Sequence, residues 1–75
     1  DQAKVAKFRA RTMAPGKRDA VFRSAGVDNT VAGWSEFDKD MLIVRAKEFS
    51  ADKFAKSYPD WDAATCAKIQ AAVRN

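Results

Sequence analysis

Apolar residues recur along most of the chain at the three- and four-residue spacing of an α-helix, and the alternation typical of strands is nearly absent. Residues 2–13 carry two parallel stripes: an apolar one of Val5, Phe8 and Thr12, and a basic one of Lys4, Lys7 and Arg11. "APG" at 14–16 interrupts the pattern, because the residue before a proline avoids helical geometry. A short second helix is predicted over 17–25, with Gly26 as its C-terminal cap. Residues 1–26 would then form a basic helical hairpin, and "VDNTVAG" after it a loop.

Three more helices are predicted between residues 34 and 74. Ser35, followed three residues later by Asp38, is a typical N-cap, and the helix after it carries a broad apolar stripe expected to face the core: Phe37, Met41, Leu42, Val44, Ala46 and Phe49. Ser50 caps a short helix that Pro59 ends, and Asp60 or Asp62 caps the last helix. The predicted fold is therefore all-α: a single domain over 1–75 of about five helices, with a C-terminal three-helix unit over 34–74.

The composition limits the kinds of chemical site that the chain can form. Only 75 residues are present, so the core is small and a partner would add to its stability. The chain has one cysteine, Cys66, and no histidine, which excludes an internal disulfide, a zinc site of the usual Cys/His type and histidine-based acid–base catalysis. We expect no enzymatic activity, no metal and no cofactor. Cys66 is expected to be a buried small hydrophobe, and a reducing compartment is favoured.

Positive charge is concentrated in the first third of the chain. The net charge is +4, but residues 1–23 hold seven bases and two acids (+5), whereas residues 24–75 hold seven bases and eight acids (−1). Such asymmetry favours a polyanion or an acidic protein surface as the partner of the N-terminal segment. The alternative is a solvated basic face without a partner. A membrane ranks below both kinds of partner, because the segment lacks a bulky aromatic face.

The segment 34–74 resembles the Myb/SANT-like, homeodomain-like helix-turn-helix. That family begins its first helix with a tryptophan, a serine or threonine, an acidic cluster and a leucine, and this chain has Trp34, Ser35, Glu36, Asp38, Asp40 and Leu42. The family's short second helix is matched by "SADKFAKSYP", and a third helix, "DAATCAKIQAAV", follows a tight corner. The chain departs from the family at Phe37 and Lys39, which replace residues that are usually acidic. The tryptophan that the family has near its second helix is absent, and Trp61 lies at the corner before the third helix instead.

The resemblance implies that the last helix lies in the DNA major groove. The expected nucleic-acid-binding residues are five bases that contact phosphate, two residues that face the groove and one that touches the DNA backbone. They are, in that order, Lys4, Lys7, Arg11, Lys17 and Arg18; Thr65 and Lys68; and Arg74. The leading hypothesis is a small protein associated with duplex DNA. The last helix is otherwise rich in alanine, which suits packing against protein. The alternative is therefore a non-enzymatic helical adaptor, or a small subunit of an oligomer or larger complex.

Overall fold

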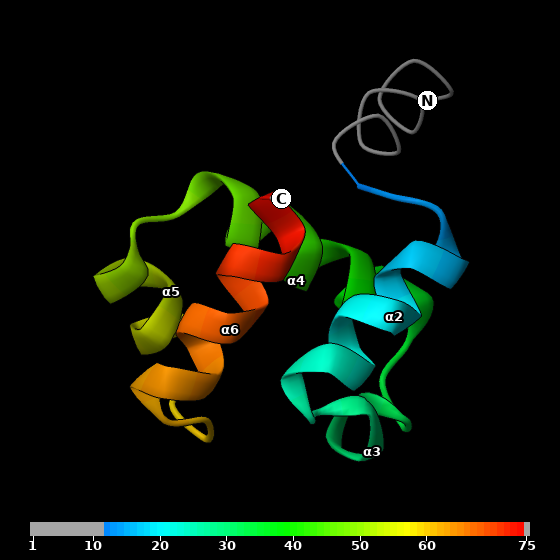
Figure 1. Cartoon of the computed structure of the whole chain (residues 1–75), viewed down its shortest axis with the longest axis horizontal. Coiled ribbons are helices and arrows are strands. Elements are labelled where there is room, and N and C mark those ends of the chain that lie inside the picture. Colours follow the sequence, from blue (N-terminus) through cyan, green and yellow to red (C-terminus); the bar gives the residue numbers. More distant parts are fainter. Residues whose placement is uncertain (1–11, 75) are drawn as a thin grey trace.

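The computed structural model describes residues 12–74, which form five α-helices (Figure 1): α2 (Pro15–Ala25), α3 (Asp28–Val31), α4 (Glu36–Glu48), α5 (Ala51–Ser57) and α6 (Ala63–Arg74). No strand occurs in this part of the chain. The prediction of a small all-α fold is confirmed, and the three helices expected between residues 34 and 74 are all present.

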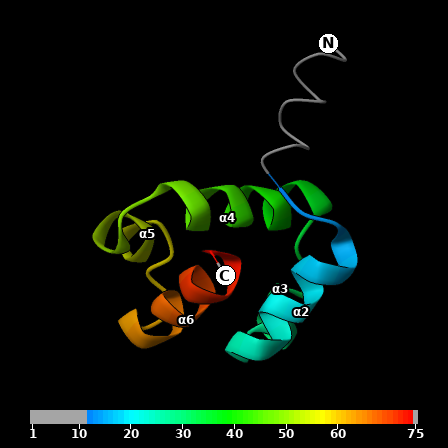
Figure 2. The same ribbon diagram turned by 45° about the horizontal axis from the view of Figure 1, so that its top comes forward.

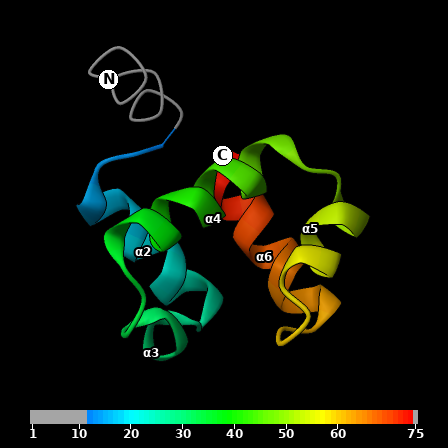
Figure 3. The ribbon, with the colours of Figure 1, turned by 180° about the vertical axis from the view of Figure 1, so that it is seen from behind.

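Helix α6 lies at the centre of the arrangement. Helices α2, α4 and α5 each pack against it, and α3 packs against α2. Figure 2 shows α4 above the other helices, and Figure 3, from behind, shows α4 crossing in front of α6. One core joins all five helices, and its buried residues are Val21, Phe22, Val27, Val31, Leu42, Ile43, Ala46, Phe54, Cys66, Ile69 and Val73. Burial of these apolar side chains is the main force that holds the helices together.

The predicted N-caps are found where the sequence places them. The Ser35 hydroxyl accepts a hydrogen bond from the Asp38 backbone N–H at 3.1 Å, and the Ser50 hydroxyl accepts one from the Lys53 N–H at 3.3 Å. Of the two candidates for the last helix, Asp62 is the cap, since its carboxylate accepts from the Thr65 N–H at 2.7 Å. These hydrogen bonds satisfy N–H groups that have no partner inside a helix, so each cap fixes where its helix begins.

Two predictions about the first third of the chain are wrong. Helix α2 begins at Pro15 rather than residue 17, because a proline in the first helical turn loses no helical hydrogen bond and already has a helical φ. The expected loop at "VDNTVAG" contains the single-turn helix α3, anchored by the buried side chain of Val31. The helix expected over 2–13, and hence the hairpin over 1–26, falls mostly outside the described residues. Thr12 and Met13, which are described, are not helical.

Two glycines, one within α2 and one that caps its end, should change the stability of the protein in opposite directions when each is replaced by alanine. Gly26 ends the helix with φ of 76°, a left-handed conformation that is strained for other residues, whereas Gly16 is helical with open space around its Cα. We expect Gly26→Ala to lower the free energy of unfolding by about 1 kcal/mol. Gly16→Ala should raise it by roughly 0.5 kcal/mol, since alanine restricts the unfolded chain. Urea unfolding followed by circular dichroism measures both, and a loss of stability in Gly16→Ala would contradict the helix start at Pro15.

Candidate functional site

The structure separates the residues expected to bind nucleic acid. Lys4, Lys7 and Arg11 lie outside the described residues. Lys17 on α2 and Lys68 on α6 are exposed, and these two helices pack side by side. Thr65 is half-buried at the start of α6, next to its cap Asp62, and the hydrogen bonds from Thr65 lower the pKa of that carboxyl group. A negative charge therefore stands at the end of α6 that was expected to enter the groove.

Arg18 is not a surface residue, so its expected contact with phosphate is corrected. Only 3% of its side chain is exposed, and its guanidinium donates to Asp40 at 2.8 Å and to Glu36, with Asp19 3.6 Å away. Burial alone would lower the pKa of Arg18, but the hydrogen bonds and charges of Asp40 and Glu36 more than offset this and raise it. Arg18 is an internal link between α2 and the N-terminal half of α4, and its charge is already neutralised.

Arg74 has a structural contact as well. It donates a hydrogen bond to the Phe49 carbonyl at 2.7 Å, and buried Gln70 donates to the same oxygen at 3.0 Å. Carbonyls at the end of a helix need such partners, so α6 caps the C-terminus of α4. The other exposed residues of α6 are Ala63, Ala64, Ala67, Lys68 and Ala71. These residues offer one charged group, and they form a weak base-reading surface.

The most distinctive surface feature is a hollow of about 270 Å³ between α4 and the end of α5, here called the aromatic pocket. Its lining residues are Trp34, Phe37, Asp38, Met41, Arg45 and Tyr58. Phe37, Asp38, Met41 and Arg45 fall at helical spacing along one side of α4. Trp34 precedes this helix, and Tyr58 follows α5. Phe37 was expected to face the core, but it is 60% exposed and lies at the rim of this pocket.

Two rings of a three-membered aromatic stack, Trp34 and Tyr58, line one wall of the aromatic pocket. Trp34, Tyr58 and Trp61 are nearly parallel, with ring centroids 5.5–6.1 Å apart, and Phe54 from the core tilts against Tyr58 at 5.1 Å. Aromatic pairs at such distances attract one another beyond the effect of burial. The wall is therefore anchored to the core through Phe54.

Arg45 supplies a positive charge to this pocket. Its guanidinium donates to the Tyr58 hydroxyl at 3.2 Å and lies 5.9 Å from the centre of that ring. Burial raises the pKa of Tyr58, and the hydrogen bond from Arg45 offsets only part of the rise. No carboxylate of residues 12–74 forms an ion pair with Arg45. Sequence patterns missed Arg45 because its surroundings depend on Tyr58, 13 positions away.

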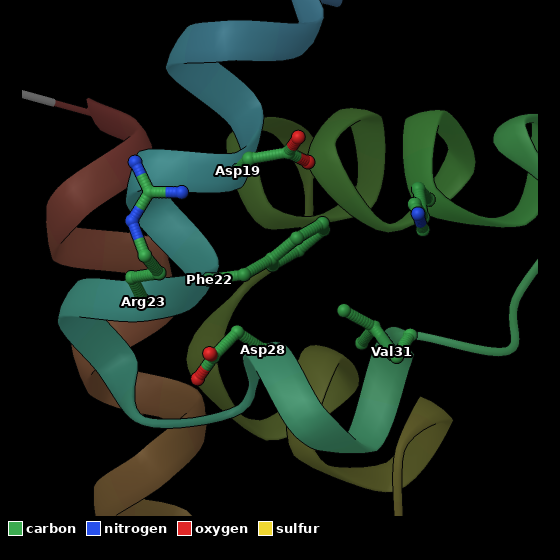
Figure 4. Close-up of a pocket in the computed structure, with 7 residues that line it drawn as sticks. Asp19, Phe22, Arg23, Asp28 and Val31 are labelled. Carbon is green, nitrogen blue, oxygen red and sulfur yellow. The ribbon is translucent and has the colours of Figure 1, made fainter.

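Two other hollows are less distinctive. One, of about 230 Å³, is lined by Phe22, Val31 and Ala32 together with two acids and two bases: Asp19, Asp28, Arg23 and Lys39. Figure 4 shows the side chains of this hollow between α2 and α3. The larger one, about 760 Å³, lies beside Arg18, Glu36 and Asp40, whose charges already pair. Neither combines an aromatic wall with a charged group that lacks an ion-pair partner.

Cys66 is buried in the core, as expected. Burial raises the pKa of its thiol, and the nearby Asp62 carboxylate adds to the rise, so the thiolate form that reacts with electrophiles is scarce at neutral pH. Within the described part of the chain, no three acidic or cysteine side chains are grouped so as to hold a metal ion. None of the helices described is long and apolar enough to cross a membrane.

Comparison with known proteins identifies no relative of this chain. It matches no protein-family model, no curated protein and no solved structure.

Proposed function

We propose that the protein is a small non-enzymatic adaptor that binds a partner polypeptide through the aromatic pocket. The observation that carries this proposal is the combination of the 60% exposed ring of Phe37 with a wall of stacked aromatic residues around Arg45. Aromatic residues and arginine dominate the energetic centres of protein interfaces. Aromatic rings bury a large area at a small cost in side-chain entropy, and the planar guanidinium of arginine makes several hydrogen bonds at once.

The described residues favour this function over sequence-specific DNA binding. Arg18 is paired inside the protein, Arg74 contacts Phe49, and acids flank the start of α6. From 12 to 74 the chain carries ten bases and nine acids, a net charge of +1, which gives little of the electrostatic attraction that DNA binding requires.

Selection from random peptide libraries tests the proposal. One library should display peptides with free C-termini, and the other should embed the same peptides within a carrier protein. We expect the selected peptides to bind Phe37→Ser at least tenfold more weakly than the unchanged protein, because an exposed anchor is lost without damage to the core. Binding to Ala71→Glu, altered on the exposed face of α6, should be unchanged. The role of the pocket would be refuted if the binding of the selected peptides were weakened by Ala71→Glu alone, or if no peptide were selected.

A second candidate function, association with duplex DNA, is favoured by the net charge of +5 on residues 1–23. Fluorescence anisotropy of a labelled random duplex tests it at low and moderate salt. Salt-sensitive binding that weakens further when Lys4, Lys7 and Arg11 become alanine would support phosphate contact by this segment. Absence of binding at low salt would refute it.

A further inference from the structure

We propose that the aromatic pocket recognises the C-terminal residue of its partner, with an apolar side chain in the hollow and the terminal carboxylate on Arg45. This inference rests on the proposed function and specifies its partner by chemistry. It follows from three properties of the pocket: the state of Arg45, the apolar character of the walls, and the size of the hollow.

Arg45 is suited to a carboxylate because its guanidinium has donors to spare. A guanidinium carries five N–H donors, and among residues 12–74 Arg45 uses one of them, in the bond to the Tyr58 hydroxyl. That bond holds the planar group beside the aromatic wall. A carboxylate matches two parallel N–H donors of arginine, as a phosphate does, and it is the anionic group at the end of a polypeptide. Arg45 is half-buried, so such a pair would be less screened by water than one at the open surface.

The remaining walls require an apolar group next to that carboxylate. Trp34, Phe37, Met41 and the ring of Tyr58 offer carbon and sulfur surfaces. Asp38, the other charged lining residue, is exposed and lies seven positions before Arg45, which is about 10 Å along an α-helix. The two charges therefore lie about two helical turns apart, although the Asp38 charge still reaches the Tyr58 hydroxyl and helps to raise its pKa. An anionic group is attracted to the Arg45 end and repelled from the Asp38 end, and this difference orients the ligand.

The size of the hollow favours a chain terminus over an internal acidic residue. A volume of about 270 Å³ lies just below the usual range for small-molecule sites and accommodates roughly one amino-acid residue. A C-terminal residue carries both its apolar side chain and its carboxylate on one Cα. An internal aspartate or glutamate would need a second, apolar residue beside it, and both would have to enter the same space.

Titration of ¹⁵N-labelled protein with N-acetyl-phenylalanine, followed by NMR, tests this inference. We expect saturable shifts of the backbone amides of Phe37, Met41 and Arg45. N-acetyl-phenylalaninamide, which has the same ring and no charge, should bind about five- to tenfold more weakly, a ratio typical of one charged hydrogen-bonded pair at a partly exposed site. Arg45→Gln should remove the preference for the acid, whereas the matched charge change Lys68→Gln outside the pocket should preserve it.

Three results would overturn the inference. The first is binding of the amide as tight as that of the acid. The second is a loss of binding in Lys68→Gln as large as in Arg45→Gln. The third is tighter binding of the cation 2-phenylethylamine than of both, which would make Asp38 the recognising group. The libraries separate this failure from failure of the proposed function. Pocket-dependent peptides selected equally from both libraries would leave the adaptor function intact and exclude recognition of the C-terminus.

Discussion

Phe54→Ala should unfold much of the protein at 25 °C. Phe54 has no exposed surface, and its ring packs in the core against Tyr58. Truncation of a buried phenylalanine to alanine costs about 3–5 kcal/mol, because the transfer free energy is lost and a cavity remains. A small domain has a free energy of unfolding of about 5 kcal/mol, so one such change consumes most of it. Circular dichroism and the dispersion of amide NMR signals should both fall sharply.

Two further variants test whether the effect of Phe54→Ala comes from the loss of a buried ring. Phe37→Ala removes the same ring from a site that is 60% exposed, and it should change the free energy of unfolding by less than about 0.5 kcal/mol. Phe54→Leu should retain the fold at a cost of about 1.5 kcal/mol. If Phe54→Ala were as stable as Phe37→Ala, the position of α5 on the core would be wrong.

Removal of the Arg18 side chain should produce the second-largest loss of stability. Breaking a fully buried ion pair costs about 3–5 kcal/mol. The carboxylates of Asp40 and Glu36 are 25% and 71% exposed, so water can solvate them again once the guanidinium is gone. We therefore expect Arg18→Ala to lower the free energy of unfolding by about 2 kcal/mol and the melting temperature by on the order of 10 °C. Thermal and urea unfolding measure these changes.

The adjacent base provides the control for Arg18. Lys17→Ala removes the same formal charge from an exposed position on α2 and should leave stability within about 0.5 kcal/mol of the original. Equal effects of the two substitutions would mean that Arg18 contributes only to net charge, and its internal role would be excluded.

Features set by neighbouring residues could be predicted from the sequence. The caps at Ser35 and Ser50 depend on residues three positions apart, and the sequence locates them correctly. The four-residue helix α3 is too short to show a helical period, so it was missed. "APG" was interpreted as a helix break, although proline also begins helices, and nothing local distinguishes the two uses.

The candidate site depends on residues far apart in the sequence, and it was mostly missed. Arg18 has the composition of a surface base, but its partners Glu36 and Asp40 are 18 and 22 positions away. The position of Phe37 on the apolar stripe of α4 suggested burial, but the packing of α4 turns it toward solvent. The aromatic pocket needs Tyr58 beside α4, which no periodicity within one helix can show.

The central position of α6 has a consequence for synthesis on the ribosome. Helices α2, α4 and α5 all pack against α6, which is made after them. While α6 is still in the exit tunnel, the surface against which the core packs is not yet available. The side chains that stay partly in water include Phe22, Leu42 and Phe54. Exposed apolar side chains of this kind bind chaperones or associate with other nascent chains. Folding should therefore occur late and in one step, once residues 63–74 have emerged.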